Sequence, residues 1–367
     1  MIPVYEPTLG DLEQQYVADC MRSGWISSLG EYVTRFQSEF AAYCGTKHGI
    51  ATSNGTTALH LALAALGIGP GDEVILPSLT FIASANAVSY TGARAVLADS
   101  ETRTWGLDPA SVEAKITSRT RAIMPVHLYG HPVDMDPILD IARHYNLFVV
   151  EDAAEAHGAT YKGHRVGGLG TISCFSFYGN KIITTGEGGM CMTNDDALAE
   201  RLLALRDHGM SSTKRYWHPI VGYNYRLTNL QAAVGVAQLS RIDEIIEKKR
   251  QIARWYNERL KEFPGLTLPP ELPDCTNVYW MYSVLIEDDF RVARDEVLTR
   301  LKAHGIETRP FFYPIHIQPP YALGQSFPVA EELARKGINL PSGPALREEE
   351  VELIAHALSQ IRCVGVD

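Results

Sequence analysis

LFVVEDA at residues 147–153 is a short run of apolar and β-branched residues that ends in an acidic pair. Similar runs precede it along the chain, separated by helix-like segments. Strands that alternate with helices predict a mostly parallel sheet covered by helices on both faces, which is an α/β fold. Ligands of such a sheet bind beyond the carboxyl ends of its strands, so we expect the chemistry there. The other predicted strands are EVILP (73–77), RAVLAD (94–99) and RAIMPV (121–126).

The last third of the chain predicts a second, smaller α/β unit. Apolar residues recur near helical spacing from Leu239 to Leu260 and stop before Pro264, which predicts one long connecting helix. A length of 367 residues accommodates two domains, predicted at 1–245 and 246–367. The elements predicted after the helix are VYWMYSVLIED (278–288), RDEVLTRLKAHG (294–305) and EEEVELIAHALSQI (348–361).

Composition excludes several classes of protein. Hydrophobic residues make up 46% and charged residues 21%, which is typical of a globular chain. We expect no membrane association and a cytoplasmic location, because no apolar run is long enough to span a bilayer and the start MIPVYEPTLGDLEQQ lacks a secretory signal. A formal charge of −10 argues against a nucleic-acid partner. The six cysteines show no zinc-like spacing, so we predict buried thiols and no metal site.

A glycine turn opens the apolar helical run SNGTTALHLALAALG at residues 53–67. The free backbone amides at the start of this predicted helix, with the hydroxyls of Thr56 and Thr57, could bind an anion such as phosphate; an ordinary N-cap explains the same residues. Asp152, at the end of the predicted strand, also has several interpretations. Its carboxylate could keep a ring nitrogen protonated, bind a metal or cap the next helix.

Lys181 lies in SCFSFYGNKIITTGEGGM (173–190), between a strand-like run and a glycine-rich turn, five residues after Ser176. A buried lysine there would be a nucleophile, because desolvation lowers its pKa and frees the amine for Schiff-base formation; a solvated surface lysine is the alternative. The stretch lacks GxxxxGK[ST], and no GxGxxG follows the first strand. Nucleotide hydrolysis and hydride transfer therefore lose their usual sequence support.

RYWHPIVGYNYRLTNLQAAVG at residues 215–235 concentrates aromatic, asparagine and arginine side chains just before the long helix. Packing is the usual role of such aromatic residues. The alternative is a loop that reaches a polar ligand across a subunit boundary.

Taken in chain order, these motifs resemble the DegT/DnrJ/EryC1/StrS family of sugar aminotransferases over nearly the whole chain. The resemblance implies the aspartate aminotransferase-like fold (fold type I), with a large domain around a mostly parallel mixed sheet and a smaller carboxyl-terminal domain. It also implies pyridoxal 5′-phosphate as cofactor and a homodimer with shared active sites. The residues that carry it are GTTALHLAL, PSLTFIASANAV (77–88), EDAAEAHGA, SFYGNKIITTGEGG and GYNYRLTNLQAA.

The resemblance assigns roles to matching cofactor residues. Lys181 would form the Schiff base and move the proton, and Asp152 would pair with the pyridinium nitrogen. Phe81 would stack on the ring, and Asn224 would reach the phosphate from the partner subunit. The implied phosphate contacts within the chain are Thr56, Thr57 and Ser176.

Two further positions point to one branch of the family. Glu155 replaces the glutamine most common in the family, and Tyr178 stands where many members carry histidine. Both variants occur in the branch that aminates GDP-4-keto-6-deoxymannose, and Glu155 is placed among the cofactor contacts. The segments WISSLG (25–30), RYWHPIVGYNYR (215–226) and RPFFYPIH (309–316) resemble the sugar-nucleotide site of that branch. Their candidate substrate contacts, for which packing is an equal alternative, are Trp25, Arg215, Tyr313 and His316.

The implied reaction transfers the amino group of L-glutamate to C4 of GDP-4-keto-6-deoxymannose in two half-reactions, with pyridoxamine 5′-phosphate between them. It implies a place in lipopolysaccharide O-antigen biosynthesis. A UDP-linked or dTDP-linked keto sugar, or a keto-octulosonate, is the alternative substrate. Sugar 3-dehydratases of the family carry histidine at the lysine position, so Lys181 argues against that activity. A non-catalytic binding or regulatory protein on the same fold is the most distant alternative.

Overall fold

A seven-stranded sheet dominates the computed structural model, which describes residues 1–363. Its strand order is β1-β9-β8-β5-β4-β2-β3. Neighbouring strands from β8 to β3 pair in parallel, whereas β9 runs against both β1 and β8. The predicted mostly parallel α/β sheet is therefore confirmed. The strands are β1 (His48–Thr52), β2 (Glu73–Pro77), β3 (Arg94–Ala98), β4 (Thr120–Ile123), β5 (Phe148–Asp152), β8 (Ile172–Ser176) and β9 (Gly189–Thr193).

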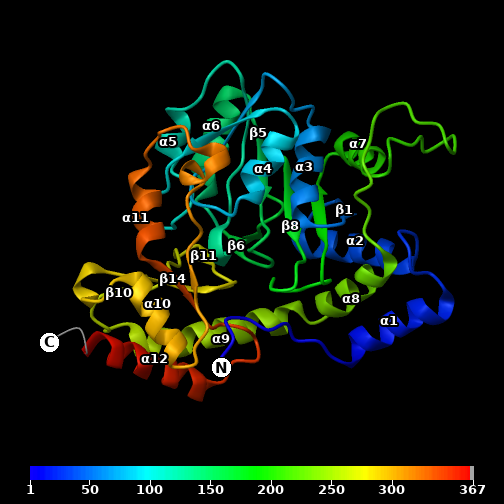
Figure 1. Cartoon of the computed structure of the whole chain (residues 1–367). Helices are drawn as coiled ribbons and strands as arrows, with labels where there is room; N and C mark the ends of the chain where they lie inside the picture. The colour runs from blue at the N-terminus through cyan, green and yellow to red at the C-terminus, as the bar shows by residue number, and fades with distance from the viewer. Residues whose placement is uncertain (364–367) are drawn as a thin grey trace.

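Helices cover this sheet along its length (Figure 1). The helix α3 packs on β8, β9, β1 and β5, and α6 packs on β4 and β5. A second layer of helices follows, because α8 packs on both α1 and α2. The helices of this region are α1 (Asp11–Ser23), α2 (Glu31–Cys44), α3 (Gly55–Ala65), α4 (Ala83–Tyr90), α5 (Pro109–Glu113), α6 (Met135–Tyr145), α7 (Asp196–Arg206) and α8 (Asn229–Leu239).

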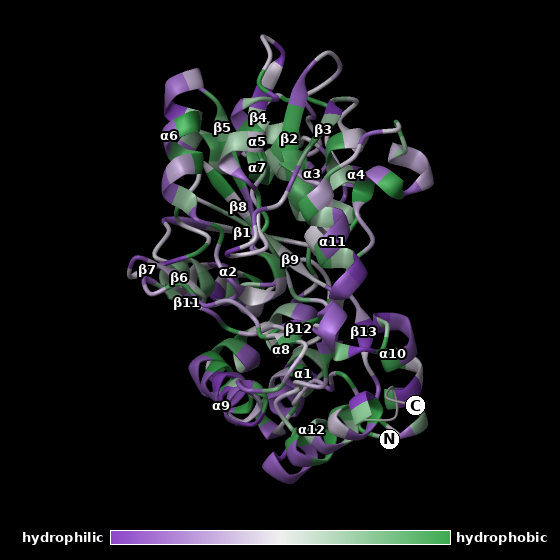
Figure 2. Cartoon of the chain, turned by 90° about the vertical axis from the view of Figure 1, so that its left-hand side faces the viewer, coloured by the Kyte–Doolittle hydropathy of each residue, from purple (hydrophilic) through white to green (hydrophobic). Residues whose placement is uncertain are grey.

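A second lobe lies below the large sheet in Figure 2, where α9 and α12 pack on each other beside a smaller antiparallel sheet. The order of this sheet is β10-β12-β14-β13. A third sheet, β11-β6-β7, adds three very short strands. The remaining elements are β6 (Thr160–Tyr161), β7 (His164–Arg165), α9 (Ile242–Leu260), β10 (Leu266–Thr267), β11 (Cys275–Thr276), β12 (Tyr282–Ile286), α10 (Arg294–Ala303), β13 (Arg309–Pro310), α11 (Pro328–Lys336), β14 (Gly337–Leu340) and α12 (Glu348–Cys363), with short 3₁₀ turns at 128–130, 288–290, 315–317 and 319–321.

The predicted connecting helix is α9, and it begins three residues after Leu239. The backbone leaves helical geometry at Arg241, with φ −128° and ψ 21°, so α8 and α9 are separate helices. The domain boundary at residue 245 falls inside α9 and stays a prediction. Of the predicted second domain, residues 364–367 lie outside the described residues.

Each lobe has its own hydrophobic core. The larger core joins α2, α3 and the strands of the large sheet, and the smaller one joins α9, β12, β14 and α12. Four of the six cysteines are buried as predicted, but the prediction was wrong for two of them. Cys275 is half-buried in the short strand β11, and Cys363 is exposed because it ends α12. Among residues 1–363, no helix is both long and apolar enough to cross a membrane.

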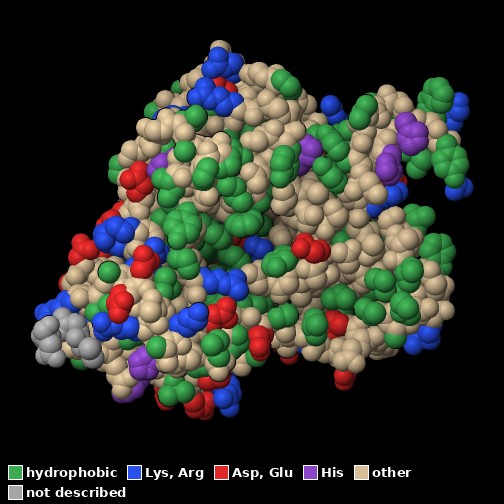
Figure 3. Space-filling model, in the orientation of Figure 1, with side chains coloured by type: hydrophobic (Ala, Val, Ile, Leu, Met, Phe, Trp, Pro, Cys, Tyr) green, Lys and Arg blue, Asp and Glu red, His purple; other side chains and the backbone are tan. Residues whose placement is uncertain are grey.

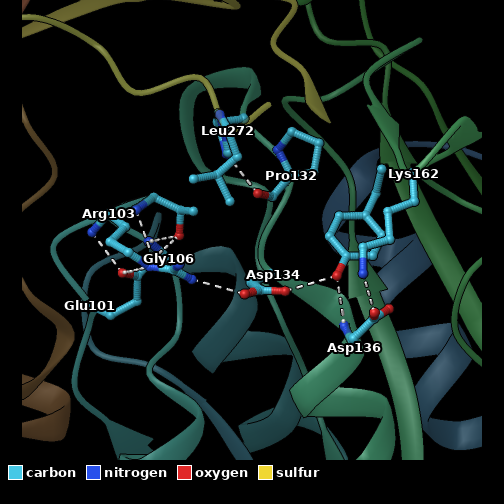
Figure 4. A network of polar contacts seen from close by, with 11 residues as sticks. Glu101, Arg103, Gly106, Pro132, Asp134, Asp136, Lys162 and Leu272 are labelled. Carbon is cyan, nitrogen blue, oxygen red and sulfur yellow. Dashed lines mark hydrogen bonds and ion pairs between the residues drawn. The ribbon is translucent and has the colours of Figure 1, made fainter. Parts of the chain in front are cut away.

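A polar network fixes the loops that follow β3 and β4 (Figure 4). Asp134 lies at its centre, where it accepts hydrogen bonds from Arg103 at 2.9 Å and from the hydroxyl of Tyr161 at 2.8 Å. Asp136 accepts a hydrogen bond from Lys162 in the turn between β6 and β7. These loops lie at the carboxyl edge of the parallel strands, so the network stabilises the edge where ligands are expected.

Candidate active site

A cavity of about 680 Å³ opens at the carboxyl edge of the large sheet. Figure 3 shows the hollow near the middle of the molecular face. One wall comes from the start of α3 and the ends of β5 and β8, and the other from segments of the second lobe. All predicted cofactor residues except Asn224 line this cavity: Thr56, Thr57, Phe81, Asp152, Glu155, Ser176 and Lys181.

The amino-terminal end of α3 forms one end of the cavity. Asn54 caps this helix, because its Oδ1 accepts the backbone N–H of Thr57 at 2.8 Å. A Cβ atom at Gly55 would lie 2.7 Å from the Cβ of Ser176, so glycine is needed for this close approach. The first turn of α3 carries no acidic side chain, so the positive end of the helix dipole faces the cavity uncompensated.

The hydroxyl groups beside this helix end differ in their availability. The Thr57 hydroxyl is engaged in the cap, where it donates to the carbonyl of Asn54 at 2.8 Å and contacts the Ser53 hydroxyl. Among the described residues, the one hydrogen bond to the Ser176 hydroxyl is a long one, 3.4 Å, from the backbone N–H of Tyr178. The N-cap interpretation of the SNGTT motif is confirmed, because Asn54 and Thr57 close a cap. Anion binding by the amides, Thr56 and Ser176 stays a prediction.

Asp152 ends β5 with its carboxylate buried against the cavity. One oxygen accepts the Ser84 hydroxyl at 2.7 Å, and the other accepts the backbone N–H of Ala154 at 3.2 Å. Burial raises the pKa of Asp152, whereas these two hydrogen bonds and the charge of Lys181 lower it. The donors stabilise the carboxylate form, which suits an anion that must face a cationic group.

Lys181 follows β8 in a turn whose backbone is fixed on both sides. Its carbonyl oxygen accepts the hydroxyl of Tyr5, and the indole N–H of Trp280 donates to the carbonyl of Asn180 at 2.7 Å. The ammonium group lies 3.9 Å from the centre of the Trp280 ring. Burial lowers the pKa of Lys181, and the nearby Glu155 and Asp152 raise it in part.

Glu155 is the carboxylate nearest to this lysine, with Oε1 3.9 Å from Nζ. Its other oxygen accepts the backbone N–H of Tyr129 at 2.7 Å. Burial raises the pKa of Glu155 to about 7, against the opposing effects of Lys181 and the Tyr129 amide. A strongly shifted carboxyl group beside a buried amine in a cavity is the pattern of a reactive site.

The wall from the second lobe includes residues that motif reasoning missed. Trp280, Arg309 and Asn339 line the cavity, as do Asn180 and Tyr129 of the first lobe. Density of aromatic residues in VYWMY (278–282) was the available signal for Trp280, and Arg309 opens the RPFFYPIH stretch. Phe81 lies between the two walls with its side chain half-exposed, 5.5 Å from the Phe312 ring.

The four predicted substrate residues lie outside this cavity. His316 is buried, with its ring nitrogens 2.6 Å from the Ser78 hydroxyl and 3.1 Å from Glu331. Tyr313 is exposed beside a second hollow that His316 also lines. Trp25 and Arg215 lie on exposed loops. Substrate contact by these residues stays a prediction, because within one chain the fold does not bring them to the cavity.

Asn224 lies in a long segment between α7 and α8, which we call the arm (residues 207–227). Figure 1 shows the arm reaching out from the body of the chain. Near its tip Tyr216, Trp217 and Val221 are 75%, 57% and 91% exposed, so their aromatic and aliphatic surfaces lack cover within the chain. The Asn224 side chain is exposed and accepts a hydrogen bond from Arg226 at 3.1 Å.

The cavity thus offers three groups to one ligand: an anion site at a helix end, a buried carboxylate, and a buried amine. This set fits a small molecule that has a phosphate group, a basic ring nitrogen and a reactive carbonyl carbon. The Schiff-base chemistry of an amine suits the carbonyl, and the carboxylate suits the protonated ring nitrogen.

Comparisons with known proteins agree with this chemistry. GDP-perosamine synthase of Caulobacter vibrioides is 52% identical over 363 residues, which cover 98% of each chain. Among solved structures, DesV of S. venezuelae shares 41% identity with a TM-score of 0.90, over 97% of this chain and 94% of its own. The PLP form of the putative sugar aminotransferase Spr1654 from Streptococcus pneumoniae shares 26% identity with a TM-score of 0.93, over 100% of both chains.

A sequence profile of the DegT/DnrJ/EryC1/StrS aminotransferase family matches residues 7–359, which is nearly the whole described chain. The predicted fold type and the predicted recognition are both confirmed by these matches. The chain belongs to the DegT/DnrJ/EryC1/StrS aminotransferase family.

Proposed function

We propose that this chain is a pyridoxal 5′-phosphate-dependent aminotransferase that converts GDP-4-keto-6-deoxymannose to GDP-perosamine with L-glutamate as donor. The observation that carries the reaction type is the meeting of Lys181, Asp152 and the start of α3 on one cavity. The substrate rests on the 52% identity with the Caulobacter GDP-perosamine synthase over nearly the full length of both chains. Cytoplasmic location and a role in O-antigen biosynthesis stay predictions.

The cofactor would be held at three points of the cavity. Its phosphate would lie at the amides of α3 with Thr56 and Ser176, and its ring nitrogen would face Asp152. Phe81 lines the same cavity and would supply an aromatic face to the ring. When bound, the cofactor supplies an electron sink for the charge that develops at the α-carbon of the donor.

The chain's own residues supply the remaining steps. Lys181 acts as nucleophile and proton carrier, and burial favours the neutral amine that both tasks require. The Trp280 ring lies over the amine, with its centre 3.9 Å from the nitrogen. Asp152 accepts hydrogen bonds from Ser84 and from the Ala154 amide, and in its carboxylate form it would favour the protonated form of the ring nitrogen. One cavity serves donor and acceptor in turn, so ping-pong kinetics are expected.

The visible spectrum of the purified protein with pyridoxal phosphate tests this function. L-glutamate should remove the band of the lysine-bound cofactor, and GDP-4-keto-6-deoxymannose should restore it. dTDP-linked and UDP-linked 4-keto sugars serve as matched alternatives in the second step. Restoration by one of these alone would reject the GDP-linked substrate but keep the reaction type. If L-glutamate caused no spectral change, the aminotransferase proposal would fail.

We also propose that the active enzyme is a homodimer in which the arm reaches the partner's cavity. Asn224 lies on the arm and does not line the cavity of its own chain. The exposed Tyr216, Trp217 and Val221 supply an apolar surface of the kind that subunit contacts bury.

Mixing two inactive variants tests the exchange of Asn224 between subunits. Lys181→Ala chains keep Asn224, and Asn224→Ala chains keep Lys181, so each mixed dimer would contain one complete site. Random pairing should restore activity at about one quarter of the wild-type sites. Recovery would not occur if Asn224 served its own chain, and light scattering that gives a monomer would reject the dimer itself.

A further inference from the structure

Three ionisable side chains form a buried cluster at the floor of the cavity. Lys181 lies 3.9 Å from Glu155, and Asp152 is close enough to affect the pKa of both. The Lys181 side chain is 11% exposed and that of Glu155 is 6% exposed, so this ion pair is almost fully removed from bulk water. A buried ion pair loses much of its attraction to the cost of desolvation.

The two carboxylates of the cluster are held differently. Asp152 accepts hydrogen bonds at both oxygens, from Ser84 and from Ala154, which stabilise its charged form. Glu155 accepts a single hydrogen bond, from the Tyr129 amide to Oε2, and its Oε1 faces the lysine. Within residues 1–363, Lys181 is the one cation that lowers the pKa of Glu155. Glu155 is therefore the carboxylate whose charge is less well compensated.

We infer that Glu155 is the group that takes the proton from Lys181 when the lysine acts as nucleophile or base, which rests on the proposed function of this cavity. The step is balanced within the chain. The N–H bond of the Lys181 ammonium breaks, an O–H bond forms at Oε1 of Glu155, and an ion pair becomes a neutral pair. No water, cation or other reactant is consumed.

Geometry and charge both support this transfer. A separation of 3.9 Å is too long for a direct hydrogen bond, but a rotation of the lysine side chain or one bridging water closes it. Burial lowers the pKa of the lysine and raises the pKa of Glu155 to about 7, so the proton affinities of the two groups approach each other. A neutral pair also avoids the desolvation cost of two buried charges.

The test measures how fast an amine-directed acylating reagent modifies Lys181 as pH rises, in the full chain without cofactor. Peptide mass spectrometry reports the rate at Lys181 alone. A proton shared by the pair predicts two rises of the rate, separated by a plateau in which the neutral lysine is a constant fraction. Glu155→Gln keeps the shape and can still accept the Tyr129 amide, but it cannot take a proton. Its profile should show one rise.

Glu187→Gln is the matched control, because Glu187 also lines the cavity but makes no ion pair with Lys181. It should keep the two rises of the wild-type protein. In the same protein without cofactor, the infrared band of a protonated carboxyl group at neutral pH should vanish in Glu155→Gln and persist in Glu187→Gln.

A single rise in the wild-type protein, with no carboxyl band that Glu155→Gln removes, would overturn the inference. Spectral turnover of the wild-type enzyme with L-glutamate and the keto sugar would still occur in that case. The failure of this inference and the failure of the proposed function are therefore distinguishable.

Discussion

Burial lowers the pKa of two lysines in the described part of the chain, Lys181 and Lys249, and their surroundings differ. Lys181 faces the cavity with two carboxylates and an indole ring around it. Lys249 on α9 is 1% exposed and donates to the carbonyl of Ser342 at 2.6 Å, with the Tyr5 ring 5.2 Å away. Burial lowers the pKa of both, that of Lys249 to about 7. Desolvation alone therefore does not make a catalytic lysine; a cavity and a nearby carboxylate distinguish Lys181.

Replacement of Lys181 should have the largest effect on turnover. Lys181→Ala should reduce amino transfer by about 10⁴-fold, because it removes both the nucleophile and the proton carrier. The measurement is the rate at which L-glutamate changes the cofactor spectrum. Lys302→Ala on the exposed face of α10 is the control and should turn over normally. Turnover by Lys181→Ala above a thousandth of the wild-type rate would contradict the role.

The next largest effect is expected at the carboxylate of the same site. Asp152→Asn removes the negative charge but can retain the bond from Ser84. We expect a loss of about 10²-fold to 10³-fold in turnover, since the amide cannot favour a protonated ring nitrogen. Ser84→Ala leaves the charge in place and should cost much less. Equal losses in the two variants would show that orientation of Asp152, and not its charge, dominates.

The sequence predicts the surroundings of Lys181 better than it predicts the burial of Lys249. Asp152, Lys181 and the start of α3 lie at the ends of β5 and β8 and after β1, so local patterns mark them. Their convergence follows from the parallel sheet. Lys249 stands in EKKRQ on an amphipathic helix, where a solvated lysine is the ordinary expectation. Residues 341–342 and Tyr5 pack against α9 beside this lysine, and these contacts join distant parts of the chain.

Contacts between distant parts of the chain also explain why sequence patterns do not predict Trp280 and Arg309 as cavity residues. Trp280 and Arg309 reach it because β12, β13 and β14 place the second lobe over the large sheet. No local motif predicts how the second lobe is placed. A strand of two residues, such as β13, is also too short to show an alternating hydrophobic pattern. For His316 the reverse holds. The RPFFYPIH motif predicts a substrate contact, but the fold buries His316 against Ser78.

Tyr5 connects the two lysines and allows a finer test. Its ring faces Lys249, and its hydroxyl donates to the Lys181 carbonyl. Tyr5→Phe keeps the ring and removes the hydrogen bond, which contributes on the order of 1 kcal/mol. We expect turnover to fall roughly fivefold as the Lys181 turn loosens, with the pH dependence of stability unchanged. Unchanged turnover together with an altered pH dependence of stability would show that the hydroxyl acts on Lys249 and not on Lys181.

The smallest effect on turnover, and the clearest effect on stability, is expected at Lys249. Its folded pKa of about 7 lies below the ordinary value of 10.5, so between these pH values the unfolded chain holds a proton that the folded chain lacks. The free energy of unfolding should therefore rise with pH through this window, by at most about 1.4 kcal/mol per pH unit. Lys249→Met removes that rise, because methionine fills a similar volume without a titrating group.

Urea unfolding of the wild-type protein and the variant across this window gives the relevant difference curve. Other titrating groups are common to both proteins and cancel in the difference. Lys248→Met is the matched control, because the Lys248 side chain lies beside the Trp255 ring on the less buried side of α9. The free energies of unfolding of this variant and of the wild-type protein should change with pH in parallel. A Lys249→Met difference that does not vary with pH would mean that this lysine stays protonated in the fold. Normal turnover by Lys249→Met would show that a buried amine with a lowered pKa, without a cavity or a carboxylate, takes no part in amino transfer.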